Sequence, residues 1–148
     1  YKYLFDYALL MVQKEFAYKL IAPPNDSLYT PLTVYTNYYL TPKLLFNVSK
    51  NSFSPKPKVD SSIIRLTPIE TPLFKLSNEE TFFKMVRSLF WGRRKTISVA
   101  LKKTPYLKLN PNFIKTPFIL KYGSKRGETL TLPDFFDLYN DLTPFIID

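Results

Sequence analysis

YALLMVQKEFAYKLI, residues 7–21, is the stretch that decides the fold class of this chain. Its first part, Tyr7 to Val12, is a continuous apolar run that predicts a strand buried on both faces. The second part places apolar side chains four residues apart and predicts a helix that ends before Pro23. A strand that leads into a helix is a unit of an α/β sheet. Because such a strand needs neighbours on each side and the rest of the sequence supplies few, we expect a preceding part of the protein to complete the sheet.

More of this sheet follows in the next segments. Thr30-Pro31 supplies an N-cap and a first helical residue, so we expect a helix there, although residues 34–39 have a strand-like composition. Residues 43–48 and 59–66 are typical of two short strands. Between them, residues 52–58 contain two prolines, which prevent regular pairing and stiffen a loop. This pattern predicts a hairpin-like return that ends the sheet.

The remainder of the sequence is typical of helices. Ser77-Asn78-Glu79-Glu80 is a capping box that opens a helix with a continuous apolar stripe. A second helix is predicted to begin near Arg93, and Thr131-Leu132-Pro133-Asp134 caps a last one. We therefore predict two parts, residues 1–70 as the end of an α/β sheet and residues 71–148 as a small all-helical domain.

The composition excludes several kinds of site. The chain contains no Cys and no His, so disulfides, thiolate or imidazole zinc sites, cysteine nucleophiles and Ser-His-Asp triads are impossible within it, and we expect no metal. Gly92, Gly123 and Gly127 form no phosphate-cradling loop. No apolar run approaches the roughly 20 residues that a bilayer requires, and no signal peptide is visible, so we expect a cytoplasmic protein.

The charge is strongly positive and unevenly distributed. Lys and Arg outnumber Asp and Glu 21 to 12, which gives a net charge of +9. Twelve basic residues and no acidic one lie between Glu80 and Glu128, interleaved with aromatic residues. Such a block fits a polyanionic partner, either nucleic acid or an anionic membrane surface, and the alternative is the solvated face of an ordinary basic protein. Nucleic-acid contact is the interpretation we favour.

Four motifs carry a resemblance to a known family. They are Met11-Val12-Gln13-Lys14-Glu15-Phe16-Ala17, Phe53-Ser54-Pro55-Lys56-Pro57-Lys58-Val59-Asp60-Ser61-Ser62, Gly92-Arg93-Arg94-Lys95-Thr96 and Arg126-Gly127-Glu128-Thr129-Leu130. In order and approximate spacing they resemble the rRNA adenine dimethyltransferases, for which F-x-P-x-P-K-V-D-S is a specific signature. The chain resembles the carboxyl-terminal half of such an enzyme, from the fifth strand of its Rossmann-like catalytic domain to its end.

The resemblance implies a fold, a cofactor and a division of roles. Residues 1–70 correspond to the carboxyl-terminal part of a Rossmann-like methyltransferase domain that uses S-adenosylmethionine, and residues 71–148 to a helical RNA-binding domain. The amino-terminal half of such enzymes holds the glycine-rich loop and acidic residue for S-adenosylmethionine, and an N-L-P-Y-type motif. The resemblance therefore implies that this chain contributes no cofactor-binding residue and that the fragment alone is inactive.

Phe53 resembles the family residue that stacks on the target adenine. A methyl donor cannot reach the amine of a paired, stacked base, so the base must be turned out and held against a surface such as an aromatic ring. A core Phe that closes the end of the sheet is the alternative. Pro55 and Pro57 are expected to keep the loop rigid. Lys56 and Lys58 either contact phosphates or merely solvate the loop, and the sequence leaves both interpretations open.

Structural roles are expected for the polar residues beside this loop. Methyl transfer depends on alignment of the amine with the methyl group more than on a strong base, so we assign no general base. Asp60 follows the loop and is expected to make capping or turn hydrogen bonds. Gln13-Lys14-Glu15, at the junction of strand and helix, is expected to support the edge of the site, with direct RNA contact as the alternative.

The predicted RNA-docking residues are basic and belong mainly to the second part. Arg93-Arg94-Lys95 lies near a predicted helix start, where backbone N–H groups would add to the side chains as phosphate ligands. The other members are Arg87, Lys102 and Lys103, and Lys56 and Lys58 of the loop.

The resemblance also implies a particular reaction. The housekeeping enzymes of this family dimethylate two adjacent adenines near the 3′ end of small-subunit rRNA during ribosome biogenesis, and Gly92–Thr96 resembles their sequence. The macrolide-resistance methyltransferases of the large subunit share the loop and are the first alternative. A noncatalytic relative that acts as a ribosome-assembly or transcription factor is the second. We expect a monomer whose partner is the small-subunit rRNA, with neither a metal nor a membrane partner.

Overall fold

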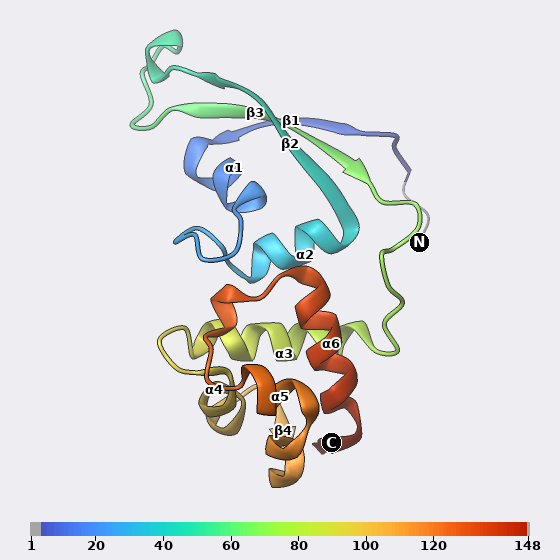
Figure 1. Cartoon of the computed structure of the whole chain (residues 1–148). Helices are drawn as coiled ribbons and strands as arrows, with labels where there is room; N and C mark the ends of the chain where they lie inside the picture. Colours follow the sequence, from blue (N-terminus) through green and yellow to red (C-terminus); the bar gives the residue numbers. More distant parts are fainter. Residues whose placement is uncertain (1–3, 148) are drawn as a thin grey trace. The chain divides into compact units, whose positions relative to one another are not determined.

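The computed structural model describes residues 4–147, and the chain divides into two units, Tyr1–Leu73 and Phe74–Asp148. Figure 1 colours the first unit from blue to green and the second from green to red. Each unit has its own secondary structure and its own buried side chains. The functional labels of the two parts remain predictions.

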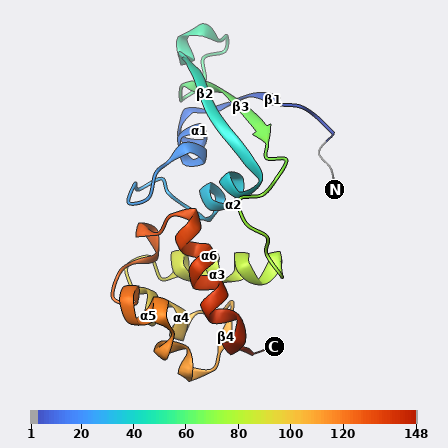
Figure 2. The same ribbon diagram turned by 45° about the vertical axis from the view of Figure 1, so that its right-hand side comes forward.

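A three-stranded antiparallel sheet is the frame of the first unit. Its strands β1 (Ala8–Gln13), β2 (Leu40–Val48) and β3 (Ser61–Pro68) lie in the order β1-β3-β2. The strands β2 and β3 form the long hairpin seen in Figures 1 and 2. The predicted strands and the hairpin-like return are thus confirmed.

Two helices, α1 (Lys14–Ile21) and α2 (Pro31–Tyr39), lie on one face of this sheet (Figures 1 and 2). Their core is built on Ala17, Leu20 and Ile64, all nearly or wholly inaccessible to solvent. The segment of α2 is helical in spite of its β-branched and aromatic composition. In the helix, its polar side chains can donate hydrogen bonds to the carbonyls at the end of α1. The Thr33 hydroxyl donates to the Lys19 carbonyl over 2.6 Å, and the Asn37 amide donates to the Leu20 carbonyl over 3.0 Å. These are carbonyls of the last turn of α1, which no helical N–H can satisfy.

The prediction that the first strand is buried on both faces is wrong for this chain. Leu9 and Met11 are each 54% exposed and Leu10 is 44% exposed. The physical reason is that β1 pairs with β3 alone among the described strands, while α1 and α2 cover only one face of the sheet.

The second unit is mainly helical. Its helices are α3 (Glu79–Trp91), α4 (Ile97–Lys103), α5 (Pro117–Tyr122) and α6 (Leu132–Leu142), with short 3₁₀ turns η2 (Pro111–Lys115), η3 (Gly127–Thr129) and η4 (Thr143–Phe145). Two strands of two residues, β4 (Lys108–Leu109) and β5 (Ile146–Ile147), pair antiparallel and are an addition to the predicted all-helical architecture. Phe82, Leu89, Ile97 and Phe135 are wholly buried at its centre. Within residues 4–147, no helix combines the length and the apolar character needed to cross a membrane.

The caps of the second unit agree with the sequence in part. The predicted box at residues 131–134 is present, with the Thr131 N–H donating to Asp134 Oδ2 over 2.9 Å. At α3 the cap is Asn78, whose Oδ1 accepts from the Thr81 N–H over 3.0 Å. Ser77 lies outside the helix and its hydroxyl instead bonds to the Tyr139 hydroxyl over 2.8 Å. The start of α3 is therefore fixed to α6 by a hydrogen bond between residues far apart in sequence.

Candidate nucleic-acid interface

The loop predicted to hold the target base lies at the tip of the β2–β3 hairpin (Figure 1). It begins with a single 3₁₀ turn, η1 (Lys50–Ser52), and Phe53 follows that turn at once. Phe53 is half-buried and is not part of the buried core of its unit, while residues 54–59 are exposed. The exposed stretch contains all four other predicted loop residues, Pro55, Lys56, Pro57 and Lys58. An accessible ring beside a short, stiffened turn is an arrangement that can receive a base, and its role stays a prediction.

Asp60 closes this loop at its base. Its Oδ1 accepts from the Lys50 N–H over 2.8 Å, and its backbone carbonyl accepts from the Lys14 N–H over 3.0 Å. One residue thus fixes the beginning of the loop to its end and to the first residue of α1. The hydrogen-bonding role predicted for Asp60 is confirmed, while the supporting role of residues 13–15 at the edge of the site stays a prediction.

A second set of hydrogen bonds anchors the hairpin below the loop. The buried Ser62 hydroxyl donates to Asn47 Oδ1 over 2.7 Å, and the Asn47 amide donates to the Tyr18 hydroxyl over 3.3 Å. Asn47 and Ser62 are also cross-strand partners in the β2–β3 register. Because Tyr18 belongs to α1, the hairpin is attached to the helix that packs on the same sheet. These contacts hold the loop on a rigid base.

Asp60→Ala is expected to loosen the loop without unfolding the unit. The substitution leaves the Lys50 N–H without its acceptor, which lowers the free energy of unfolding by about 1 kcal/mol and speeds hydrogen exchange at the Lys50 amide. Urea denaturation and amide exchange measure the two effects. Asp26→Ala is the matched control, because Asp26 accepts the Leu28 N–H in another turn of the same unit. Equal exchange at Lys50 in both variants would contradict the role of Asp60.

Two motifs that lie apart in sequence meet in the second unit. Gly92–Thr96 joins α3 to α4, Arg126–Leu130 leads toward α6, and Thr96 and Arg126 form an antiparallel bridge. Each motif contains a glycine at a close approach. A Cβ on Gly92 would stand 2.7 Å from the Ala100 Cβ, and one on Gly127 would stand 2.6 Å from the Leu89 Cβ. Both distances are too short for a side chain, so the motifs have a packing role as well as a charge.

Arg93 and Arg94 occupy different environments at this junction. Arg93 Nε donates to Glu128 Oε2 over 2.8 Å, and Arg126 Nη1 lies 3.8 Å from Glu128 Oε1. The Glu128 side chain is only 20% exposed, which strengthens its attraction to the two cations. Arg94 is exposed, and no carboxylate pairs with it among residues 4–147. Of the two, Arg94 is therefore the one whose guanidinium is open to an external anion.

Backbone N–H groups at the start of α4 do not add to these cations as predicted. The helix begins at Ile97, after the basic run. The Ile97 N–H donates to the Lys125 carbonyl over 2.8 Å, the Ser98 N–H to the Gly123 carbonyl over 3.1 Å, and the Lys95 N–H to the Gly92 carbonyl over 2.7 Å. Because the chain itself supplies the acceptors, these three amides are not available to a phosphate.

The remaining predicted RNA-docking residues are exposed or stacked on aromatic rings. Lys102 and Lys103 are exposed in the last turn of α4. The Arg87 guanidinium lies 4.4 Å from the centre of the Tyr106 ring, and the Lys95 ammonium lies 4.3 Å from the centre of the Trp91 ring. These contacts hold cations at fixed positions without cancelling their charge.

Glu128→Ala is expected to destabilise the second unit. It removes the acceptor of the charged hydrogen bond from Arg93 and leaves two cations side by side, which lowers the free energy of unfolding by about 1–3 kcal/mol. Glu80→Ala is the control, because Glu80 pairs on the surface with Lys84, whose hydrogen bond and charge lower the pKa of the Glu80 carboxyl. That variant is expected to leave stability nearly unchanged, because this pair is exposed to solvent. Urea denaturation of both variants measures the difference, and equal losses would oppose the proposed contribution of Glu128.

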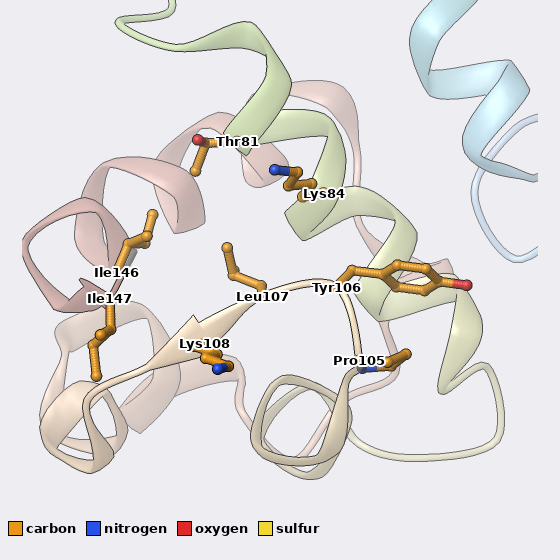
Figure 3. Close-up of a pocket in the computed structure, with 8 residues that line it drawn as sticks. All are labelled: Thr81, Lys84, Pro105, Tyr106, Leu107, Lys108, Ile146 and Ile147. Atoms are coloured by element: carbon orange, nitrogen blue, oxygen red, sulfur yellow. The ribbon is translucent and has the colours of Figure 1, made fainter.

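A surface groove of about 260 Å³ lies in the second unit (Figure 3). It is lined by Thr81, Lys84, Pro105, Tyr106, Leu107, Lys108, Ile146 and Ile147. Rossmann-like sites bind the ribose of a nucleotide cofactor through an acidic residue and its phosphates or adjoining groups through a glycine-rich turn. No carboxylate lines this groove, and the chain has no glycine-rich loop, so the groove does not fit S-adenosylmethionine. Among residues 4–147, no group of three His, Cys, Asp or Glu side chains is placed to hold a metal ion.

Comparison with solved structures shows which fold these units belong to. The crystal structure of a dimethyladenosine transferase from Plasmodium falciparum matches all of this chain and 62% of its own, with a TM-score of 0.80 and 27% identity. The crystal structure of the 23S rRNA methyltransferase ErmE matches 93% of this chain and 55% of its own, with a TM-score of 0.59 and 25% identity. The predicted fold class, the end of a Rossmann-like methyltransferase sheet followed by a helical domain, is confirmed by these neighbours.

Comparison with protein sequences identifies the family. The family described as "Ribosomal RNA adenine dimethylase" matches residues 2–132. The ribosomal RNA small subunit methyltransferase A of Halothermothrix orenii is 38% identical over 141 residues, which are 93% of this chain and 46% of that protein. The protein of the same name from Alkaliphilus oremlandii is 37% identical over 135 residues, 90% of this chain and 47% of its own length. The chain belongs to the ribosomal RNA adenine dimethylase family, and it spans about half the length of the curated relatives it matches.

Some residues of the candidate interface carry no clear signal in the sequence. Glu128 is the first acidic residue after the basic block, but nothing in its spacing identifies Arg93, 35 positions earlier, as its partner. Tyr106 likewise contacts Arg87 across a helix and a loop. The Trp91–Lys95 contact spans four residues, and this spacing is the one signal that could have revealed it.

Proposed function

We propose that this chain is the target-loop and RNA-docking half of an S-adenosylmethionine-dependent rRNA adenine dimethyltransferase acting on the small ribosomal subunit. The protein that contains it would dimethylate two adjacent adenines near the 3′ end of the small-subunit rRNA during ribosome biogenesis. The observation that carries the proposal is the 38% and 37% identity with two proteins named ribosomal RNA small subunit methyltransferase A. The TM-score of 0.80 with a dimethyladenosine transferase, against 0.59 with a 23S rRNA methyltransferase, supports it. Together these similarities favour the small-subunit reaction over the large-subunit alternative.

The two units would have separate roles in this reaction. Phe53 would stack on the extruded adenine at the tip of a hairpin that Asp60 and Tyr18 fasten to α1. The second unit would hold the rRNA backbone through its exposed cations, among them Arg94, Lys102 and Lys103.

The cofactor would be bound upstream of this chain. S-adenosylmethionine supplies the methyl group when bound, and the groove of the second unit does not fit it. The part played by the present residues is to orient the base, so that its exocyclic amine is aligned for the transfer. As the amine formed the new carbon–nitrogen bond, the carbon–sulfur bond of the donor would break, S-adenosylhomocysteine would leave, and the amine would release one proton to water. No side chain of this chain is assigned as a base.

Labelled methyl transfer to unmodified small ribosomal subunits tests the proposal. The 148-residue chain and the complete gene product are assayed side by side with labelled S-adenosylmethionine, and the modified nucleosides are identified in digested rRNA. Dimethyladenosine is expected only with the complete protein. Unmodified large subunits serve as the control substrate, and label appearing there instead would favour the large-subunit reaction.

Two other results would reject the proposal. Transfer by the short chain alone would show that its cofactor site lies within the present residues. No transfer by either protein, with rRNA still bound, would favour a noncatalytic ribosome-assembly or transcription factor.

A further inference from the structure

Trp91 is a large aromatic side chain in an unusual position. It is the only tryptophan of the chain, it is the last residue of α3, and it is 45% exposed. It stands at the end of the helix face that carries Lys84 and Arg87, and it is not among the buried side chains that form the core of the unit. Among residues 4–147 no other aromatic ring stacks on it. The ring is thus open to an external partner.

One cation contacts this ring, and two more lie on the same side of α3. The Lys95 ammonium lies 4.3 Å from the ring centre. Its attraction to the electron-rich face of the indole restrains the ring and places a positive charge on that face. On α3, Lys84, Arg87 and Trp91 stand at i, i+3 and i+7, so they share one side of the helix, opposite its buried stripe. Arg87 is held on Tyr106, which lines the groove of Figure 3 together with Lys84. Positive charges and aromatic rings thus alternate along this side of α3, and we call this set the row: Lys84, Arg87, Trp91, Lys95 and Tyr106.

This combination selects one class of partner. Proteins bind single-stranded nucleic acid by stacking bases on aromatic rings beside a positively charged track for the backbone. A duplex offers only phosphates and groove edges to such a row, because its bases are stacked on one another. The groove beside the row is lined by Lys84 and Lys108 and by no carboxylate. Glu80 pairs with Lys84 over 2.7 Å, so Lys108 is the groove cation that is open to a polyanionic partner.

We propose that Trp91 is a stacking platform for an unpaired RNA base, with Arg87, which pairs with no carboxylate among residues 4–147, contacting an adjoining phosphate. The proposal rests on the RNA-binding role proposed above and goes beyond it, because it assigns a second base-recognition point in a different unit from Phe53. The second unit then distinguishes unpaired from paired RNA, whereas a uniform basic face would bind both by charge alone.

The single tryptophan makes the contact directly measurable. Emission at 295 nm excitation reports Trp91 alone in the full 148-residue chain, so titration with a short oligoadenylate is expected to quench it in a saturable manner. A fully paired RNA hairpin with the same number of phosphates is the control probe. It is expected to bind, as seen by fluorescence anisotropy of an end label, with little change in tryptophan emission.

Variants separate stacking from charge. Trp91→Ala is expected to weaken oligoadenylate binding by roughly tenfold and hairpin binding by less than about twofold. Trp91→Phe keeps a ring and is expected to retain most of the affinity, which guards against loss through misfolding. Leu120→Ala is the matched control, because Leu120 is an apolar residue of the same unit that is 74% exposed and lies outside the row.

Each outcome decides between the two proposals. Quenching by oligoadenylate with the loss in Trp91→Ala supports the stacking platform. Binding of both RNAs with unchanged emission and an unaffected Trp91→Ala variant overturns the platform and leaves the RNA-binding role intact. Failure of the chain to bind either RNA overturns both the platform and the docking role, while the methyl-transfer assay on the complete protein still reports the reaction independently.

Discussion

Phe53→Ala in the complete protein is expected to lower the rate of methyl transfer to small ribosomal subunits by roughly a hundredfold or more. Stacking of a base on an aromatic side chain contributes about 1–3 kcal/mol, and the loss of that surface also leaves the extruded adenine free to turn. The Kd for S-adenosylmethionine is expected to change by less than about twofold, because the cofactor would be bound by residues upstream of this chain. Single-turnover transfer and equilibrium dialysis measure the two quantities.

Two further variants test whether the ring itself is responsible. Phe53→Trp retains a stacking surface and is expected to keep most of the transfer rate. Val59→Ala is the matched control, since Val59 is the other apolar side chain of the same loop and is 48% exposed. If Phe53→Ala weakened cofactor and rRNA binding together, or if Val59→Ala reduced transfer as strongly, then Phe53 would be a structural residue of the loop and not a contact to the base.

Local features of the fold could be read from the sequence. The i,i+4 apolar spacing of α1, the proline at the first position of α2 and the cap at Thr131 are signals contained within a few residues, and all three helices form. The hydrogen bond of Asp60 was predictable for the same reason, because Asp60 ends the loop and its side chain accepts from an N–H of that same loop. Where the chain is governed by neighbours in sequence, the prediction and the structure agree.

Features that depend on distant neighbours could not be read in this way. The apolar run of β1 correctly indicates a strand, but its burial depends on what lies beside it, and the described residues supply one strand and one covered face. The helix start near Arg93 was misplaced because the bridge between Thr96 and Arg126 holds the basic run in a turn. From the motif G-R-R-K-T alone, both arginines are predicted to dock RNA. In the structure only Arg93 pairs with Glu128, which lies 35 positions away in the sequence.

Replacing Arg94, Lys102 and Lys103 together by Gln is expected to weaken binding of small-subunit rRNA by roughly a hundredfold at physiological salt. All three side chains are exposed, and no carboxylate pairs with any of them among residues 4–147. Each contact between such a cation and a phosphate displaces a condensed counterion, so the slope of log K against log salt is expected to become shallower by about 2 to 3. Filter binding at a series of salt concentrations measures both the affinity and the slope.

Two matched variants show whether position or net charge causes this loss. Replacing Lys115, Lys121 and Lys125 by Gln removes the same number of positive charges, from exposed sites around α5. This variant is expected to weaken rRNA binding by less than about tenfold. Arg93→Gln is expected to leave the salt slope nearly unchanged and to lower stability, because Glu128 already neutralises that guanidinium within the fold. If both triple variants weakened binding equally, net charge alone would explain RNA binding, and the proposed position of the docking surface would be rejected. A full loss of slope in Arg93→Gln would show instead that the rRNA competes with Glu128 for that arginine.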